Sequence, residues 1–197
     1  MLSGTYQVTI ENPATGDKLT RNVEITPRFV AGDVIIDYTY SGNYRVRVYS
    51  DDGQPVGAGE EVLIKINGKS KTVKTNAKGY ATFKVSNLLP KTYSITAEYE
   101  GFKISNKVVV KQILKAQNKK FKRYKVKKYT ATLKTSSGKA INGKKITFKI
   151  KGKTYKAKTN KKGVATIKIK GLTKVGKYKV TINFLKTSIK KTITIKR

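Results

Sequence analysis

The chain has 197 residues, 38% of them apolar, and its 44 Lys and Arg against 11 Asp and Glu give a formal charge of +33. This length allows one large domain or two small ones. It contains no Cys, His or Trp, which excludes disulfides, thiolate and imidazole metal sites and the usual Ser-His or Cys-His catalytic pairs.

Two targeting features are also missing from the sequence. No run of 18 apolar residues occurs, so no membrane-spanning segment is expected. The first ten residues, MLSGTYQVTI, lack a basic region followed by an apolar core. If the protein is exported, we expect its signal to lie outside this sequence.

The first predicted element is a β-hairpin within residues 1–28. Residues 4–28 read GTYQVTIENPATGDKLTRNVEITPR and correspond to residues 91–112 and 176–197, which end two later repeats. We interpret the segment as the last two strands of a partial unit. Because a lone hairpin is marginally stable in water, we expect it to pack on the next unit, pair with another chain or be poorly ordered.

Two complete units follow, at residues 29–112 and 113–197, joined near residues 112–120. The clearest repeat is KTNAKGYATFKVSNL at residues 74–88 against KTNKKGVATIKIKGL at residues 158–172, which agree at nine of fifteen positions. Outward from these segments, the two units align with one single-residue gap in each. Such a period predicts a tandem array.

Apolar and polar residues alternate within each unit, for example in residues 62–66, 93–99, 146–150 and 178–184. This period of two, with many β-branched and aromatic residues, is typical of strands with one buried face. About seven such strands per unit, separated by turn sequences such as Asn-Gly, predict an all-β protein made of two tandem immunoglobulin-like β-sandwiches.

A turn is predicted at the same place in each unit, where Thr-Asn-x-x-Gly precedes a strand. The side chains of Asn76 and Asn160 can accept a backbone N–H two residues on, and Gly79 and Gly163 can adopt a positive φ. The alternative interpretation is a ligand-binding loop, but no metal-binding or catalytic side chain accompanies it.

A tyrosine opens the next-to-last strand of each unit, at Tyr93 and Tyr178, and Tyr6 occupies the same place in the partial unit. This position resembles the tyrosine corner of Greek-key sandwiches, where the ring packs and the hydroxyl bonds to backbone. The alternative is a simple core aromatic, and neither interpretation indicates a ligand site.

The motif Thr-Asn/Asp-x-x-Gly-x-Ala before a short strand resembles the bacterial Ig-like repeats of the invasin and intimin type. More closely, the segment GKKITFKIKGKTYKAKTNKKGVATIKIKGLTKVGKYKVTINF resembles Ig-like repeats of large adhesin-like surface proteins of methanogenic archaea. The likeness covers residues 4–197. It implies a stalk or wall-proximal spacer at the cell surface, with neighbouring Ig-like repeats in a longer chain and no catalytic residues to carry over.

No catalytic, metal or cofactor site is predicted. Abundant Ser and Lys allow a Ser-Lys pair only by chance. The paired carboxylates Asp51-Asp52 and Glu60-Glu61 could bind Ca²⁺ in the first unit only, although turn chemistry explains Asp51 and Asp52 more simply. Related adhesin sandwiches sometimes contain a Lys–Asn isopeptide bond promoted by a buried carboxylate. Only the first unit has candidates for that carboxylate, Glu60 and Glu98, because residues 113–197 contain no Asp or Glu.

The charge is divided unequally between the two halves. Residues 1–112 carry 15 basic and 11 acidic side chains, a formal charge of +4, whereas residues 113–197 carry 29 basic side chains and no acidic one. Since the two units are expected to share a fold, the fold does not require this charge. A face with so many cations should attract polyanions.

Strand parity predicts where the lysines of the second unit lie. If the apolar residues of three neighbouring strands face the core, the alternate positions face solvent. The predicted polyanion-facing residues are Lys149, Lys151, Lys177, Lys179, Lys190 and Lys196. The predicted partner is an anionic cell-wall polymer, an acidic glycan or lipid head groups.

Three hypotheses of function follow. The first is a structural repeat of a surface adhesin whose second unit faces the wall. The second is a free-standing polyanion- or nucleic-acid-binding module. Against nucleic acid, Lys outnumbers Arg by 27 to 2 in residues 113–197, whereas phosphate forks and base readout favour Arg. The third, an enzyme, has no motif. Exposed lysines also protect sheet edges, but this charge exceeds what solubility requires.

Overall fold

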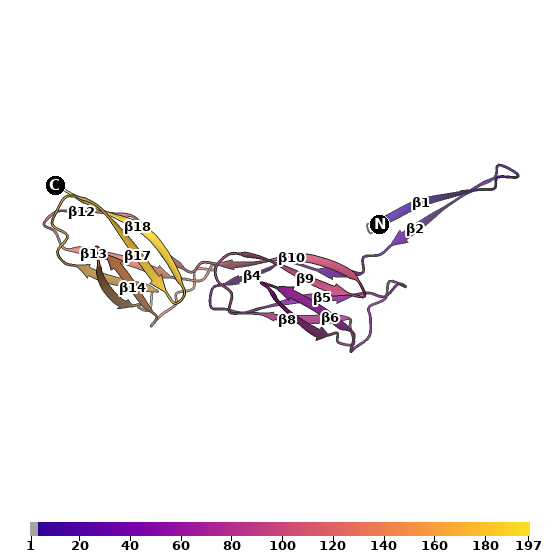
Figure 1. Ribbon diagram of the computed structural model, residues 1–197, viewed down its shortest axis with the longest axis horizontal. Helices are drawn as coiled ribbons and strands as arrows, with labels where there is room; N and C mark the ends of the chain where they lie inside the picture. The colour runs from indigo at the N-terminus through magenta and orange to yellow at the C-terminus, as the bar shows by residue number, and fades with distance from the viewer. Residues whose placement is uncertain (1–3) are drawn as a thin grey trace. The chain divides into compact units, whose positions relative to one another are not determined.

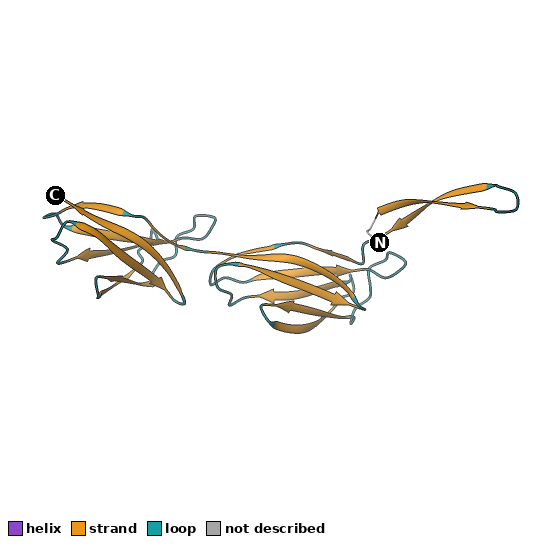
Figure 2. Ribbon diagram, turned by 45° about the horizontal axis from the view of Figure 1, so that its top comes forward, coloured by secondary structure: helices purple, strands orange, loops and turns teal. Residues whose placement is uncertain are grey.

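The computed structural model describes residues 4–197, and all regular secondary structure in that range is β-strand (Figures 1 and 2). The prediction of an all-β, tandem Ig-like protein is therefore confirmed. By its internal contacts the chain divides into two compact units. One contains residues up to 34 together with 42–85 and 93–108, and the other contains 35–41, 86–92 and 109–197.

The strands fall into three groups along the chain. The N-terminal hairpin consists of β1 (Gly4–Glu11) and β2 (Lys18–Ile25). The first repeat contains β3 (Phe29–Ala31), β4 (Val34–Asp37), β5 (Gly42–Val48), β6 (Glu61–Ile66), β7 (Lys69–Lys74), β8 (Tyr80–Val85), β9 (Thr92–Tyr99) and β10 (Phe102–Lys111). The second repeat contains β11 (Leu114–Ala116), β12 (Lys119–Lys122), β13 (Lys127–Leu133), β14 (Lys145–Ile150), β15 (Lys153–Lys158), β16 (Val164–Ile169), β17 (Gly176–Phe184) and β18 (Thr187–Lys196).

Each repeat is built from a three-stranded and a five-stranded sheet. In the first repeat the strand orders are β3-β5-β8 and β4-β10-β9-β6-β7, and in the second they are β11-β13-β16 and β12-β18-β17-β14-β15. The two repeats therefore have the same sheet topology. The pairing of β12 with β18 is parallel, whereas β17 pairs with β18 and with β14 antiparallel.

The first strand of each repeat is interrupted, so each repeat has eight strands rather than the seven expected. The chain crosses from one sheet to the other at residues 32–33 and 117–118. A side-chain oxygen stabilises each crossing: Oδ1 of Asp33 accepts the N–H of Lys107 at 2.7 Å, and Oδ1 of Asn118 accepts the N–H of Thr192 at 2.8 Å. The first half-strand thus pairs in the three-stranded sheet and the second half in the five-stranded one.

The N-terminal hairpin has the pairing of the last hairpin of a repeat. Tyr6 lies opposite Val23 in β1–β2, as Tyr178 lies opposite Ile193 in β17–β18. In β18 Ile193 is fully buried, whereas Val23 is 44% exposed. The other apolar side chains of the hairpin are exposed as well: Val8, Ile10 and Leu19. The hairpin forms a two-stranded sheet of its own, without the second sheet that covers the same face in a complete repeat.

The core of the second repeat lies between its two sheets. Tyr129 from β13 and Phe148 from β14 are at most 1% exposed and meet edge to face, with ring centroids 6.1 Å apart. Aromatic pairs prefer this geometry. Ile146, Ile182 and Ile193 of the five-stranded sheet are fully buried around them. The strand parity read from the sequence therefore places the apolar face correctly.

Candidate polyanion-binding surface

The outer face of the five-stranded sheet in the second repeat carries alternating lysines and threonines. On β14 the apolar side chains at positions 146, 148 and 150 are at most 2% exposed, so Lys149 between them projects to solvent. Lys149 pairs with Thr181 of β17, which pairs with Lys190 of β18. These three strands are adjacent in the sheet, as predicted.

Three more of the predicted lysines lie on β17 and β18 of this face. Lys177 and Lys179 of β17 are exposed and pair with Thr194 and Thr192 of β18. Lys196 is exposed and pairs with Lys122 of β12. The pairing also brings in exposed lysines of β12 and β15 that the sequence did not single out, namely Lys120, Lys122, Lys156 and Lys158.

Lys151 does not belong to the strand face. It follows the last residue of β14 and has a φ of 45°, beside Gly152 with a φ of 74°. Both residues form the β14–β15 turn. The sequence-based placement was wrong because parity was carried one residue past the end of the strand. Lys151 is exposed, but at the end of the sheet rather than on its outer face.

The matching face of the first repeat carries acidic as well as basic side chains. Glu98 of β9 accepts a hydrogen bond from Lys65 at 2.9 Å and lies 3.7 Å from the ammonium of Lys103. The hydrogen bond from Lys65 lowers the pKa of Glu98, so the carboxylate stays charged. At the positions of Lys177 and Lys179 the first repeat has Thr92 and Ser94. Within residues 4–197, every ion pair lies between residues 11 and 103.

The predicted corner turns have the same geometry in both repeats. Oδ1 of Asn76 accepts the N–H groups of Lys78 and Tyr80, and Oδ1 of Asn160 accepts those two and four residues on at 3.0 Å. Gly79 and Gly163 both have a φ of 74°. A Cβ atom at Gly163 would lie 2.4 Å from the carbonyl oxygen of Leu133. These contacts stabilise the turn itself, as the structural interpretation predicts.

The predicted tyrosines have structural contacts as well. The hydroxyl of Tyr178 donates to the carbonyl of Lys174 at 2.9 Å, four residues upstream, and the ring is partly buried. Tyr93 is 7% exposed. Tyr129, which the sequence did not single out, is 1% exposed and donates to the carbonyl of Gln117 at 2.7 Å. Burial raises the pKa of Tyr129 to about 12.

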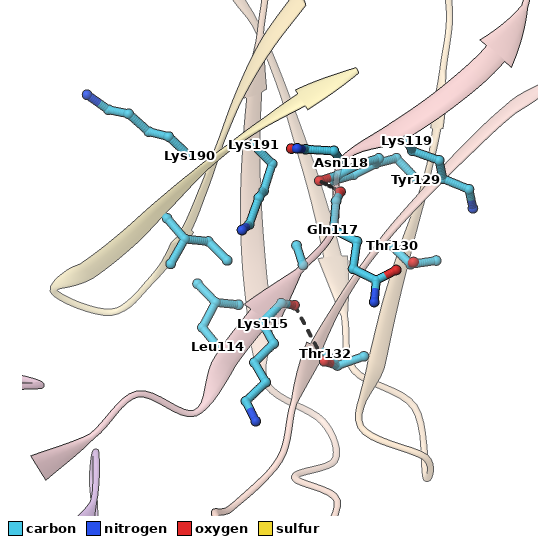
Figure 3. A pocket seen from close by; sticks show the side chains of 12 residues that line it. Leu114, Lys115, Gln117, Asn118, Lys119, Tyr129, Thr130, Thr132, Lys190 and Lys191 are labelled. Carbon is cyan, nitrogen blue, oxygen red and sulfur yellow. Dashed lines mark hydrogen bonds between the residues drawn. The ribbon is translucent and has the colours of Figure 1, made fainter. Parts of the chain in front are cut away.

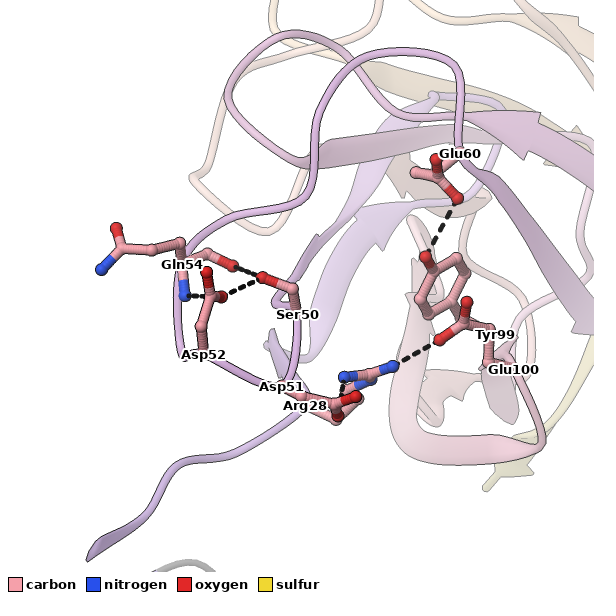
Figure 4. Close-up of polar contacts among 8 residues, drawn as sticks. All are labelled: Arg28, Ser50, Asp51, Asp52, Gln54, Glu60, Tyr99 and Glu100. Atoms are coloured by element: carbon pink, nitrogen blue, oxygen red, sulfur yellow. Dashed lines mark hydrogen bonds and ion pairs between the residues drawn. The ribbon is translucent and has the colours of Figure 1, made fainter.

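Asp51 and Asp52, adjacent in the sequence, have different partners (Figure 4). The guanidinium of Arg28 contacts Asp51 and Glu100, while Asp52 accepts from Ser50 and from the N–H of Gln54. Asp51 and Asp52 therefore point to different partners. Among residues 4–197, no group of three or more acidic side chains is placed to hold a metal ion.

The two candidate carboxylates for an isopeptide bond are also bound elsewhere. Glu60 accepts from the hydroxyl of Tyr99 at 2.9 Å (Figure 4). Glu98 faces solvent beside Lys65. A buried lysine does occur, but in the second repeat: Lys127 is 5% exposed, and its ammonium donates to the carbonyls of Arg123 and Lys125 at 2.6 and 2.9 Å. Lys127 is the one buried charged residue in the part of this repeat that the structure describes, and backbone carbonyls accept hydrogen bonds from its ammonium.

Comparisons with known proteins concern the fold. No protein-family model matches the sequence, and no curated protein matches it. Similar solved structures include the bacterial integrin-binding protein invasin, with 20% identity and a TM-score of 0.43, and the D0-D1 domain of intimin, with 17% and 0.38. A third is the Yersinia pseudotuberculosis adhesin InvE, with 13% and 0.38.

These matches cover 85%, 86% and 86% of the chain, and 39%, 97% and 59% of invasin, intimin D0-D1 and InvE respectively. The chain thus spans well under half of the invasin chain. In the described residues, no helix is long and apolar enough to cross a membrane.

Proposed function

We propose that the chain is a structural segment of a cell-surface, adhesin-like protein, in which Ig-like repeats serve as a stalk or wall-proximal spacer. The second repeat then faces an anionic wall polymer or acidic glycan. The sequence resemblance to surface proteins of methanogenic archaea supports an extracellular, wall-associated location. Its covalent neighbours are further Ig-like repeats, and its role is not enzymatic.

The observation that carries the proposal is the contrast between two equivalent faces. Both repeats use the same sheet order. On the first, Glu98 neutralises Lys65, and Thr or Ser occupies other outer positions. On the second, Lys149, Lys177 and Lys179 are exposed in a repeat without any acidic residue. Repulsion among like charges destabilises a folded state. An anionic partner would offset this repulsion, which supports a polyanion-binding role for the face.

Five lysine substitutions test the proposal in the full chain: Lys149, Lys177, Lys179, Lys190 and Lys196, each changed to Thr. All five are exposed on the outer face, so folding is expected to persist. Binding to polygalacturonate or heparin, measured by titration calorimetry, is expected to weaken strongly. A control variant changes five exposed loop lysines to Thr: Lys139, Lys144, Lys161, Lys162 and Lys174. The control variant loses the same charge and is expected to bind the polymer more tightly than the outer-face variant does.

Salt dependence measures how many charges engage the polymer. If five lysines meet a polymer as densely charged as DNA, the slope of log K against log salt is about −4.5, or roughly 500-fold between 50 and 200 mM. A less densely charged wall polymer gives a shallower slope. Equal affinity of the two variants would show that the outer face is not the binding surface. A preference for DNA or RNA over acidic glycans of equal charge would favour the nucleic-acid-binding module instead.

A further inference from the structure

The second repeat has a groove beside the lysine face, and Lys190 of that face is among its lining residues. It lies where the first strand crosses between the sheets and has a volume of about 930 Å³. Residues of β11, β13 and β18 line it together with Gln117 and Asn118 of the crossing. Figure 3 shows these side chains around the opening. Pockets for small molecules typically measure roughly 300–1,000 Å³, so the groove can admit part of a chain-like ligand.

Lys191 occupies an inward-facing position at this groove. Along β18 the side chains at 189, 191, 193 and 195 share one face, and Ile193 and Ile195 are at most 1% exposed in the core. Lys191 pairs with Val180, which is fully buried. Its side chain therefore starts from the inner face of the sheet, and the residue is half-buried. In Figure 3 Lys191 extends toward the opening, whereas Lys190 extends away from it.

The groove combines further cations with neutral polar groups and an apolar floor. Lys115 of β11 and Lys119 of β12 line it, and Gln117 contributes an exposed amide between them. In the described chain neither Lys115 nor Lys191 forms an ion pair. Leu114 forms part of the floor and is 1% exposed. Charged, amide and apolar groups thus converge on one opening.

In the first repeat a side-chain hydrogen bond joins the two sheets at the same place. There Tyr44 donates to Oδ1 of Asn106 on β10 at 2.8 Å, which links the two sheets. In the second repeat the equivalent residues are Tyr129 and Lys191, and Tyr129 donates instead to the Gln117 carbonyl. Lys191 therefore does not bond to Tyr129 as Asn106 bonds to Tyr44, and it lines the groove instead.

The charges around this place differ as well. Lys115 replaces Val30, and Asn118 replaces Asp33. The crossing hydrogen bond needs only a side-chain oxygen, which both Asp33 and Asn118 provide. Asn118 in place of Asp33 therefore removes a negative charge and keeps the hydrogen bond at the crossing. Thr130 and Thr132 of the lining replace Arg45 and Arg47, but the changes at positions 115, 118, 119, 190 and 191 each add a positive charge or remove a negative one. The lining is therefore more positive than its counterpart in the first repeat and is suited to an anion.

We propose that this groove binds an acidic sugar unit of a polysaccharide, with Lys115 and Lys191 contacting its carboxylate and Gln117 its hydroxyl groups. The inference rests on the proposed function, because it assigns the site that recognises a sugar unit within the anionic polymer that the lysine face attracts. Lysine ammonium groups are point charges with three donors, which suits a carboxylate on a hydroxylated ring.

Nucleic acid fits the groove less well. Single-stranded nucleic acid is usually bound by stacking its bases on exposed aromatic rings. The one aromatic ring in the groove, Tyr129, is only 1% exposed, so it offers no surface for stacking. Neither is there an arginine in the lining. An oligonucleotide of matched charge is therefore the appropriate competitor in the test.

Two triple variants of the full chain separate the groove from the lysine face. The groove variant takes residues of the first repeat: Lys115→Val, Asn118→Asp and Lys191→Asn. The face variant changes Lys149→Thr, Lys177→Thr and Lys179→Ser. Each removes three positive charges overall, so long-range attraction falls equally. Circular dichroism and thermal melting check that both variants fold. The probes are tetragalacturonate, polygalacturonate, neutral maltotetraose and a tetranucleotide.

The expected result is loss of tetragalacturonate binding by about tenfold or more in the groove variant, with less than about a threefold change in the face variant. Amide chemical shifts of residues 115–119 and 189–191 are expected to move when tetragalacturonate is added to the wild-type chain. Maltotetraose is expected not to bind. Equal losses in the two variants, or shift changes confined to the outer face, would overturn the groove assignment. Equal or tighter binding of the tetranucleotide at the groove would overturn the ligand class.

The two proposals fail in different ways. If polygalacturonate binds and only the face variant weakens it, the proposed function stands and the groove assignment is wrong. If tetragalacturonate binds at the groove but polygalacturonate gains nothing from the face lysines, the groove stands and the wall-facing role of the sheet is wrong. If the wild-type chain binds neither probe, both are wrong.

Discussion

Replacing Gly163 by alanine tests how the corner turn fixes the second repeat. Gly163 has a φ of 74°, and an added Cβ would lie 2.4 Å from the carbonyl oxygen of Leu133 and 3.2 Å from the backbone nitrogen of Ile141. These two atoms form a hydrogen bond of 3.1 Å. The added methyl group must therefore displace a buried backbone hydrogen bond as well as strain its own backbone.

The two costs can be separated with a second glycine. The left-handed conformation costs a non-glycine residue about 1–2 kcal/mol, and leaving a buried backbone group unsatisfied costs about 1–3 kcal/mol more. Gly163→Ala is thus expected to destabilise the second repeat by about 2–5 kcal/mol. Gly152 has the same φ of 74° but no atom within 4 Å of an added Cβ. Gly152→Ala is expected to show the backbone cost alone.

The assay is hydrogen exchange of the full chain with mass spectrometry, which reports peptides of each repeat separately, supported by calorimetry. Gly163→Ala is expected to lower protection throughout residues 113–197 and to leave residues 42–85 unchanged. Gly79→Ala, whose Cβ would lie 2.9 Å from the carbonyl of Val48, is expected to act likewise on the first repeat, with a smaller loss. Equal effects of Gly163→Ala and Gly152→Ala would refute the steric explanation.

Three further predictions follow from the cores and the ion pairs. Because burial raises the pKa of Tyr129 from about 10 when unfolded to about 12, the neutral phenol's contribution to stability is complete below pH 10 and is lost as pH rises to 12; the stability advantage over Tyr129→Phe should fall by up to about 3 kcal/mol in urea unfolding across that range, and a pH-independent difference would contradict this. Phe148→Leu is expected to lower stability by about 1–3 kcal/mol, since the side chain is fully buried against Tyr129; an unchanged melting temperature would place the core elsewhere. Arg28→Ile, which introduces the residue at the equivalent position 113, is expected to destabilise the first repeat by at most about 1 kcal/mol, because the carboxylates of Asp51 and Glu100 that share this cation are 95% and 55% exposed, and added salt should reduce the loss; a larger, salt-independent loss would point to packing instead.

Much of the fold could be predicted from the sequence because period-two alternation fixes which side of a strand is buried. That Ile146 and Phe148 face the core follows directly from this alternation. The interruption of the first strand could not be predicted in this way. Leu114 and Ala116 share one parity, Phe121 falls on the other, and residues 117–120 between them are all polar. Such a stretch also fits a loop, and it is the strand pairing and the hydrogen bond from Thr192 to Asn118 that show a change of sheet.

For the candidate site, the sequence predicted the exposure of some lysines correctly and misplaced or missed others. Lys149, Lys177 and Lys179 are exposed as parity predicts, although their role stays a proposal. Lys151 was misplaced because parity does not indicate where a strand ends. Lys191 was missed because adjacent Lys190 and Lys191 look alike in sequence while their side chains lie on opposite faces of β18. A useful signal was available: Lys191 occupies the inner parity of Ile193 and Ile195.

The parallel pairing of β12 with β18 determines how the second repeat responds to tension. The pair joins Lys119–Lys122 to residues 193–196, one strand near each end of the repeat. When the two ends are pulled apart, parallel strands must slide along each other, so their hydrogen bonds are loaded together and in shear. The antiparallel β17–β18 hairpin, pulled at its open end, would instead separate one bond at a time. Extension of the repeat beyond β11 therefore requires the β12–β18 pair to rupture in shear, so these bonds are expected to resist unfolding under force.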